Sequence, residues 1–252
     1  MKSRPKLYCV LSDIHYPEHD KKALNAVFDF LSKNKVDGLI LNGDSLDFSC
    51  CSHHVPKQAR KRGGLKSDLD GFDKQILRKL EILVPKNAER KFGKGNHCRF
   101  LDDYLTEENP ELEGMLSVEG YLGLKERGWE VGQLGYSFQI GRLNVMHGDS
   151  LGSGVHAAKK ALDVVSDNVM IGHGHQVQCY SKTSPIKQKH KICSWMCGCL
   201  CNLTQNYGKG RANAWIHAFG LVYVYPNGQF NVYVPIICDG TFLWNGTLYG
   251  AR

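Results

Sequence analysis

Five short polar motifs in the first 175 residues contain side chains that bind divalent metal ions. In chain order they are Asp13-Ile14-His15, Gly43-Asp44-Ser45-Leu46-Asp47, Gly95-Asn96-His97, His147-Gly148 and Gly172-His173-Gly174-His175. The candidate ligands are two carboxylates, one amide oxygen and four imidazoles, namely Asp13, His15, Asp44, Asn96, His147, His173 and His175. Such a mixture of oxygen and nitrogen donors suits Mn, Fe, Zn or Ni and fits Ca poorly.

The number of these donors predicts two metal ions. One ion does not need seven candidate ligands, whereas two ions that share a carboxylate do. Two ions about 3.5–4 Å apart can hold a bridging hydroxide and clamp the oxygens of an in-line displacement at phosphorus. Each motif alone has an ordinary explanation, such as a turn with a surface histidine. Five of the eleven histidines and two strand-end aspartates would have to fall into this order by chance, so the complete set favours phosphoester hydrolysis.

Apolar runs before the motifs predict the strands that position them. Four of the five motifs directly follow such a run, and buried strands are expected at 6–12, 36–42, 89–94 and 168–171, with a hairpin formed by 137–140 and 143–146. The carboxyl ends of parallel strands gather along one edge of a sheet. Side chains that are distant in the sequence can therefore converge on one site.

Amphipathic helices are expected between these strands, at 21–33, 68–83 and 155–165. This alternation indicates an α/β architecture with largely parallel central strands. After residue 176 the chain becomes β-rich, and Pro226-Asn227-Gly228 predicts a hairpin between 216–225 and 229–235. No linker or repeat interrupts the sequence, so we expect a single domain over 1–252, with the metal motifs within 7–176 and a β-rich part at 177–252.

Together the motifs resemble the signature of the calcineurin-like metallophosphoesterase superfamily, over residues 7–176. The resemblance implies a four-layer α-β-β-α sandwich of two mixed sheets flanked by helices. It implies that one metal ion is held by Asp13, His15, Asp44 and His175. Asp44 would bridge to a second ion, whose other ligands would be Asn96, His147 and His173. Manganese is the expected metal, with iron, zinc, nickel or magnesium as alternatives. His97 would stay uncoordinated and act on the scissile phosphate.

One position departs from the superfamily pattern. Cys98 follows His97, where the family usually has Asp or Glu, and a thiol is a poor orienting partner. Asp47 is the nearest motif carboxylate that could orient His97 instead, so His97 and Asp47 are the expected catalytic residues. The departure also leaves open a non-catalytic module that binds metal or nucleic acid. A weaker similarity to phage-type metallophosphoesterases lies in the Gly-Asn-His-x-Arg99 spacing.

The charge of the chain favours a polyanionic substrate. Its net charge is +7 with a pI near 8.8, and basic residues follow the Asp44 motif. Candidate substrate-binding residues are Lys57, Arg60, Lys61, Arg62 and Arg99, although a solvated loop explains the first four equally well. The favoured function is a phosphodiesterase or nuclease acting on nucleic acid or nucleotides. The alternative is a phosphomonoesterase of small molecules or phosphoproteins.

Ten cysteines and the absence of an export signal predict reduced thiols in the cytoplasm, which would be the host cytoplasm if the chain is phage-encoded. The sequence contains no run of about 18 apolar residues, so a membrane is not expected as a partner. Cys193, Cys197, Cys199 and Cys201 could bind zinc only if the chain turns at Gly198, so small buried thiols are the favoured interpretation. The sequence does not determine the oligomeric state.

Overall fold

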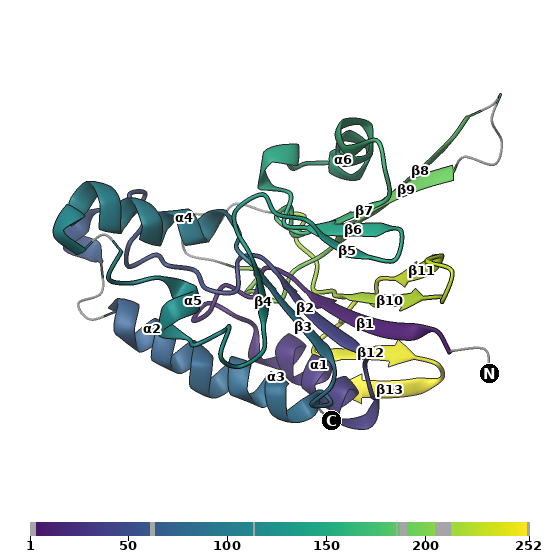
Figure 1. Cartoon of the computed structure of the whole chain (residues 1–252), viewed down its shortest axis with the longest axis horizontal. Helices are drawn as coiled ribbons and strands as arrows, with labels where there is room; N and C mark the ends of the chain where they lie inside the picture. The colour runs from purple at the N-terminus through teal and green to yellow at the C-terminus, as the bar shows by residue number, and fades with distance from the viewer. Residues whose placement is uncertain are drawn as a thin grey trace.

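Two mixed β-sheets form the centre of the molecule (Figure 1). This computed structural model describes residues 4–60, 64–112, 114–184, 186, 191–204 and 213–250. Among these residues, the larger sheet has six strands and the smaller sheet has five.

The larger sheet combines a parallel centre with two antiparallel strands from the C-terminal part of the chain. Its parallel strands are β1 (Lys6–Leu11), β2 (Gly38–Asn42), β3 (Glu89–Gly93) and β4 (Glu130–Gly132). On the other side of β1, antiparallel pairs add β10 (Gly220–Val224) and β11 (Phe230–Tyr233). The last two form the hairpin expected around Pro226-Asn227-Gly228.

The smaller sheet is also mixed. Its strands are β5 (Phe138–Ile140), β6 (Leu143–Met146), β7 (Val169–Ile171), β8 (Val177–Thr183) and β9 (Lys191–Cys197). The pairs β6–β7 and β7–β9 are parallel, while β5–β6 and β8–β9 are antiparallel. Strands after residue 176 therefore join both sheets, because β8 and β9 extend the smaller sheet and β10 and β11 extend the larger one.

Helices cover the outer face of each sheet (Figure 1). Beside the larger sheet lie α1 (Lys21–Lys33), α2 (Gly64–Phe72), a π-helical turn (Asp73–Leu77) and α3 (Arg78–Leu83), and the smaller sheet is covered by α6 (Ala157–Val165). Asp20 caps α1, since its carboxylate accepts a hydrogen bond from the Ala23 N–H. No helix in the described part of the chain has the length and apolar character that crossing a bilayer requires.

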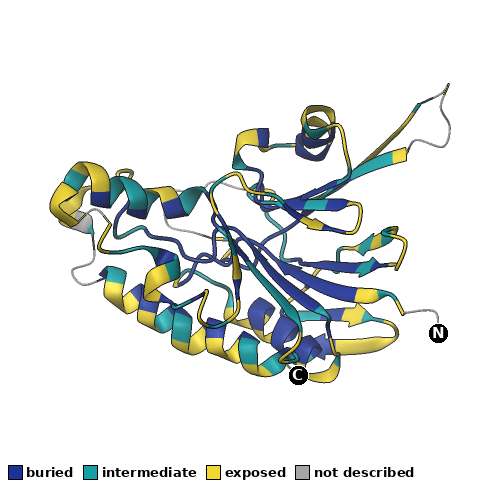
Figure 2. Cartoon of the chain, viewed as in Figure 1, coloured by how far each residue is buried: buried dark blue, intermediate teal, exposed yellow. Residues whose placement is uncertain are grey.

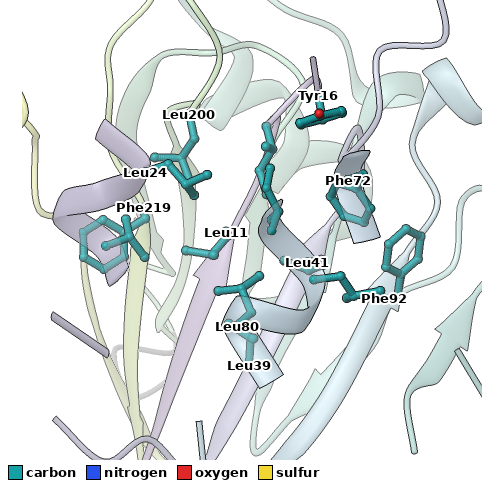
Figure 3. Close-up of a cluster of buried hydrophobic side chains, with 14 of the residues drawn as sticks. Leu11, Tyr16, Leu24, Leu39, Leu41, Phe72, Leu80, Phe92, Leu200 and Phe219 are labelled. Atoms are coloured by element: carbon teal, nitrogen blue, oxygen red, sulfur yellow. The ribbon is translucent and has the colours of Figure 1, made fainter. Parts of the chain in front are cut away.

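Three apolar clusters separate the four layers. The largest lies between the larger sheet and its helices, where Leu39 and Leu41 of β2 contact the same cluster as Phe72 and Leu80 (Figure 3). Ile40 points the opposite way and packs between the two sheets. A third cluster joins the smaller sheet to α6. Central strands are buried on both faces, as their continuous apolar runs predict (Figure 2). The predicted α-β-β-α sandwich is confirmed.

Several elements differ from the sequence-based expectation. The helix expected at 68–83 begins earlier, at Gly64, because Leu65, Leu69 and Phe72 continue its apolar face at helical spacing. Two short helices were not predicted, α4 (Asn96–Asp103) and α5 (Val118–Tyr121). Nor was the hairpin of β12 (Thr241–Trp244) and β13 (Thr247–Gly250), whose Tyr249 ring packs on Phe30 of α1.

Candidate metal centre

The predicted metal ligands follow the carboxyl ends of strands in both sheets. From the larger sheet, β1, β2 and β3 are followed by Asp13, His15, Asp44 and Asn96. From the smaller sheet, β6 and β7 are followed by His147, His173 and His175. Hydrogen bonds join the two sets of turns, because the Asn42 amide donates to the Met146 carbonyl over 2.9 Å. The structure thus brings all seven residues together at adjoining edges of the two sheets.

The turns that carry these ligands have unusual backbone conformations. Left-handed φ values between 45° and 59° occur at Asp13, His15, Asp44, His173 and His175. Each such residue costs on the order of 1–3 kcal/mol, and this kind of strain concentrates at functional sites. Steric contacts explain why glycines occupy two of the motif positions. A Cβ at Gly43 would lie 2.3 Å from Nδ1 of His147, and one at Gly95 would lie 2.2 Å from Oδ1 of Asp44.

One group of donors consists of Asp13, His15 and His175, all of them buried. Nε2 of His175 lies 3.1 Å from Oδ1 of Asp13 and 3.3 Å from Nε2 of His15. Nε2 of His15 lies 3.8 Å from the same Asp13 oxygen. Three donor atoms from two turns, one after β1 and one after β7, therefore surround one point, as the ligands of a single metal ion do.

A second group consists of Asp44, His147 and His173, with Asn96 among them. Nε2 of His147 lies 3.1 Å from Oδ2 of Asp44 and 3.0 Å from Oδ1 of Asn96. The same Asn96 oxygen is 2.9 Å from Nδ1 of His173. This set of one carboxylate, one amide oxygen and two imidazoles corresponds to the second expected metal ion.

Asp44 belongs to the second group and also approaches the first. Its Oδ2 is 3.1 Å from Nε2 of His147 in the second group and 3.9 Å from Nε2 of His15 in the first. Its Oδ1 accepts a hydrogen bond from the backbone N–H of His97 over 2.9 Å. The carboxylate is therefore held in place from a third side, and its position fits that of a ligand shared by two ions.

Contacts behind the imidazoles fix which nitrogen faces the centre. Nδ1 of His147 lies 3.1 Å from the Asn42 carbonyl, which can only accept, so Nδ1 carries the proton and Nε2 is left for a metal. Nδ1 of His15 lies 3.1 Å from Oδ1 of Asp47 and leaves its Nε2 free in the same way. The donor set therefore fits divalent metal ions in the chemistry and direction of its atoms.

Two buried carboxylates give the centre its negative charge. Burial alone would raise the pKa of Asp13, but His175 and His15 hold that pKa well below its usual range. Burial would also raise the pKa of Asp44, but His147 holds that pKa below its usual range. Against the opposing effect of burial, the carboxylates raise the pKa of His15 to about 10 and that of His147 to about 9. A cation that binds here displaces these protons and takes over the neutralisation of the carboxylates.

His97 lies at the partly exposed border of the centre. Its ring centroid is 4.4 Å from that of His15, and 16% of its side chain is exposed. Its Nδ1 lies 2.7 Å from the backbone carbonyl of Asp47 and 3.4 Å from the carboxylate Oδ1 of the same residue. Although His97 also lies within ligand range of His15 and Asp44, the carbonyl already occupies its Nδ1.

Cys98 and Asp47 have different surroundings. The Cys98 side chain is buried in the largest apolar cluster, and burial raises the pKa of its thiol to about 12. Asp47 contacts His97 mainly through its carbonyl, whereas its carboxylate is closer to His15. The structure thus places Asp47 beside both histidines, as a support for a metal ligand as well as for His97.

The basic residues expected to bind substrate are placed differently from one another. Arg99 is exposed in α4, two residues after His97. Arg60 is only 10% exposed, and its guanidinium forms a bidentate pair with the Glu108 carboxylate, which also pairs with Lys57. Lys57 and Arg60 therefore already have an acidic partner. Lys61 and Arg62 lie outside the described residues.

All ten cysteines are free thiols. The chain does turn at Gly198, with φ 71°, but among the described residues only Cys199 and Cys201 join a possible metal-binding group, together with His175. The Cys197 thiol instead donates to the Ile171 carbonyl. The four cysteines therefore do not form one zinc site, and three of them are buried as expected.

Several contacting residues were missed by sequence reasoning. The Cys201 sulfur lies 3.7 Å from Nδ1 of His175, and the Trp215 ring packs on His175 with centroids 4.3 Å apart. The Ser12 hydroxyl donates to the Asp13 carboxylate. Only Ser12 had a local signal, its place beside a motif aspartate. The others come from distant segments, so no spacing could have indicated them.

Comparisons with known proteins give one curated relative. No family model matches the chain. The chain is 26% identical to the Gene 54 protein of Mycobacterium phage D29 over 257 residues, which cover 97% of this chain and 98% of that protein. This relationship extends over the whole length and therefore includes the β-rich C-terminal part.

Solved structures similar to this chain include vacuolar protein sorting 29 from Cryptosporidium parvum (14% identity, TM-score 0.46, covering 99% and 97% of the two chains). Others are Vps29 complexed with Zn²⁺ from Entamoeba histolytica (14%, 0.45, 98% and 97%) and a predicted phosphoesterase from Streptococcus pneumoniae (11%, 0.37, 99% and 99%). The sequence motifs and the structure of the chain itself give a more specific indication of its fold than these similarities. The order of its metal motifs, its two mixed sheets and the convergence of the motif side chains resemble the calcineurin-like metallophosphoesterase fold.

Proposed function

We propose that this chain is a dinuclear metal-dependent phosphoesterase that cleaves phosphodiesters of nucleic acid or nucleotides. The observation that carries the proposal is the pair of donor groups on either side of the Asp44 carboxylate. These seven oxygen and nitrogen donors, five of them with left-handed φ, have no structural purpose that apolar residues would not serve better. Two divalent ions, with manganese as the first choice, would supply Lewis-acid activation of water and of the phosphoryl oxygens.

His97 is the residue that would act on the substrate directly. Because the Asp47 carbonyl only accepts hydrogen bonds, Nδ1 of His97 carries a proton and Nε2 is the atom left for the substrate. In its protonated form, with the Asp47 carboxylate 3.4 Å away, His97 could give the Nε2 proton to the leaving oxygen. The buried residues would hold the metal ions that bind the phosphate, and His97 at the partly exposed border would face the leaving oxygen.

The substrate class rests on charge and position. The net charge of +7 favours a polyanion, and exposed Arg99 lies near His97 on the same helix. The resemblance of the whole chain to a phage protein and its free thiols support activity in the cytoplasm of a host cell. Cys98 does not favour a non-catalytic module, because Asp47 contacts His97 instead.

The test begins with protein purified without chelator. We expect two metal ions per chain and, with manganese, turnover of bis-p-nitrophenyl phosphate that exceeds turnover of the monoester. Asp44→Asn should lose both ions and all activity, and should unfold at a lower temperature because bound metal no longer stabilises the fold. A matched control is Asp239→Asn, an exposed aspartate with almost the same φ, 48° against 45°. Two fully bound ions in Asp44→Asn, or monoester preference in the wild type, would contradict the proposal.

A further inference from the structure

A strip of aromatic rings leads from the metal centre to the protein surface. It starts at His97, whose ring centroid lies 4.4 Å from that of His15, and continues to Phe100, 4.7 Å from His97. Phe100 in turn contacts His53 at 5.7 Å and His54 at 5.6 Å, each edge-on. We call His53, His54 and Phe100 the aromatic strip.

The strip comes from two separate segments. His53 and His54 lie in the loop after the Asp44 motif, and Phe100 lies in α4, one turn after His97. Both histidines are exposed and Phe100 is partly exposed. The two imidazoles are 4.0 Å apart at 47°. Exposed rings gathered next to a catalytic histidine have π-faces that solvent does not satisfy well, and flat aromatic ligands stack on such faces.

The position of the strip defines the part of the substrate that it meets. His97 is assigned to the leaving oxygen, so the group attached to that oxygen lies on the His97 side of the phosphate. On that side the next residues outward are those of the aromatic strip. A leaving alcohol that carries a flat aromatic ring can therefore stack there while its phosphate reaches the metal ligands.

We propose that the aromatic strip is a nucleobase subsite that binds the leaving nucleoside of the substrate. This inference rests on the proposed function for the side of the phosphate it occupies. Nucleobases are the aromatic groups attached to natural phosphodiesters, and stacking on histidine or phenylalanine tolerates any base. Exposed Arg99, beside Phe100, can pair with a further phosphate of the same ligand.

The test measures binding rather than turnover. Calorimetric titration of manganese-loaded protein should show adenosine monophosphate binding about 5- to 150-fold more tightly than ribose 5-phosphate, the range expected for one stacked base. Both ligands present the same phosphate dianion, so their difference isolates the base. The double variant His53→Ala/His54→Ala and the single variant Phe100→Leu should each reduce the ratio towards one while leaving the affinity for ribose 5-phosphate unchanged.

The matched control is His156→Ala, since this histidine is also exposed but precedes α6 on the other sheet. Equal affinities of the two ligands for wild-type protein would overturn the inference, as would a loss in the variants that is equal for both ligands. Failure of the proposed function looks different, because ribose 5-phosphate would then not bind at all or would bind without turnover of any diester. A tetra-adenylate that binds more tightly than the mononucleotide, with the gain lost in Arg99→Ser, would identify nucleic acid as the source of the base.

Discussion

His97 combines a fixed ring with a free nitrogen. Its Nδ1 is held by the Asp47 carbonyl at 2.7 Å, and its own backbone N–H is held by Asp44. The sequence alone could name His97 as catalytic only through a family resemblance. The structure adds the physical reason, since the hydrogen bond to a carbonyl determines the tautomer and leaves Nε2 available.

His97→Ala should therefore retain both metal ions and slow diester turnover by about 10²–10⁴-fold, the usual contribution of a general acid. The loss should be smaller for p-nitrophenyl esters than for esters of alkyl alcohols, because p-nitrophenolate leaves without a proton. Metal analysis and steady-state kinetics with both kinds of ester check this. A metal ion missing from the variant would show that His97 is a ligand.

The Asp47 carboxylate lies closer to His15 than to His97, the histidine it was expected to orient. This buried carboxylate lies 3.1 Å from Nδ1 of His15, closer than to Nδ1 of His97. A carboxylate behind a ligating imidazole strengthens the ligand and fixes its orientation. The main effect of the Asp47 carboxylate should therefore be on metal binding, through His15.

Asp47→Asn should weaken metal affinity by about 10- to 100-fold, as is typical when such a supporting contact is changed. The backbone carbonyl that holds His97 is kept in this variant, so turnover at saturating metal should fall less than in His97→Ala. Titration of metal-free protein with Mn²⁺ measures the first effect. Unchanged metal affinity together with slow turnover would instead assign Asp47 to His97.

At the scale of elements, the basic loop after the Asp44 motif is tied to the segment that follows α4. Arg60 donates to the Val55 carbonyl within the loop and pairs with Glu108 at the end of a π-helical turn (Tyr104–Glu108). From the sequence, these cations are expected either to bind substrate or to lie in a solvated loop. No local pattern indicates this ion pair, because Glu108 is 48 residues away from Arg60 in the sequence.

Glu108→Gln should lower the melting temperature at neutral pH. Lys57 and then Arg60 hold the pKa of Glu108 below its ordinary value of 4.5, although burial acts in the opposite direction. Its stabilising effect is therefore complete above about pH 4.5 and is lost as the pH falls through the depressed pKa of the folded state. The difference in melting temperature between variant and wild type should accordingly shrink as the pH falls below about 4.5.

Exposed Glu107 provides the control, since Glu107→Gln should leave the melting temperature unchanged at every pH. If the difference in melting temperature between Glu108→Gln and the wild type does not shrink at low pH, the stabilising effect of Glu108 comes from its packing and not from its charge.

At the scale of the whole molecule, an apolar cluster joins the two sheets. Ile40 of β2 is fully buried there with Val145 of β6 and Met170 of β7. The C-terminal strands extend both sheets, so the described strands of 7–176 and of 177–252 belong to the same hydrogen-bonded sheets. The chain should consequently unfold as the single domain that the sequence predicts.

Ile40→Ala should destabilise the protein by about 2–5 kcal/mol, the range for an isoleucine cavity in a core. Ile82→Ala, on an 82% exposed side chain of α3, should change stability by less than about 0.5 kcal/mol. Urea unfolding followed by tryptophan fluorescence and by circular dichroism should give one coincident transition for both variants. Two separate transitions would show that the sheets fold as independent units.

The sequence by itself determined the chemistry of the centre and the main elements around it. Ligand types such as Asp13 and His147 are readable because each lies at the end of an apolar run, and strand and helix periods are local properties. One local signal was overlooked, the Asn245-Gly246 pair that predicts the β12–β13 hairpin.

Only the tertiary structure decided how those pieces meet. It distributed the ligands over two sheets, placed the Asp47 carboxylate against His15, paired Arg60 with Glu108 and aligned Phe100 with His53 and His54. These contacts join segments far apart in the sequence, and their partners are selected by packing between layers. Periodicity and spacing describe one segment at a time, so they carry no information about which side chain a distant segment will present.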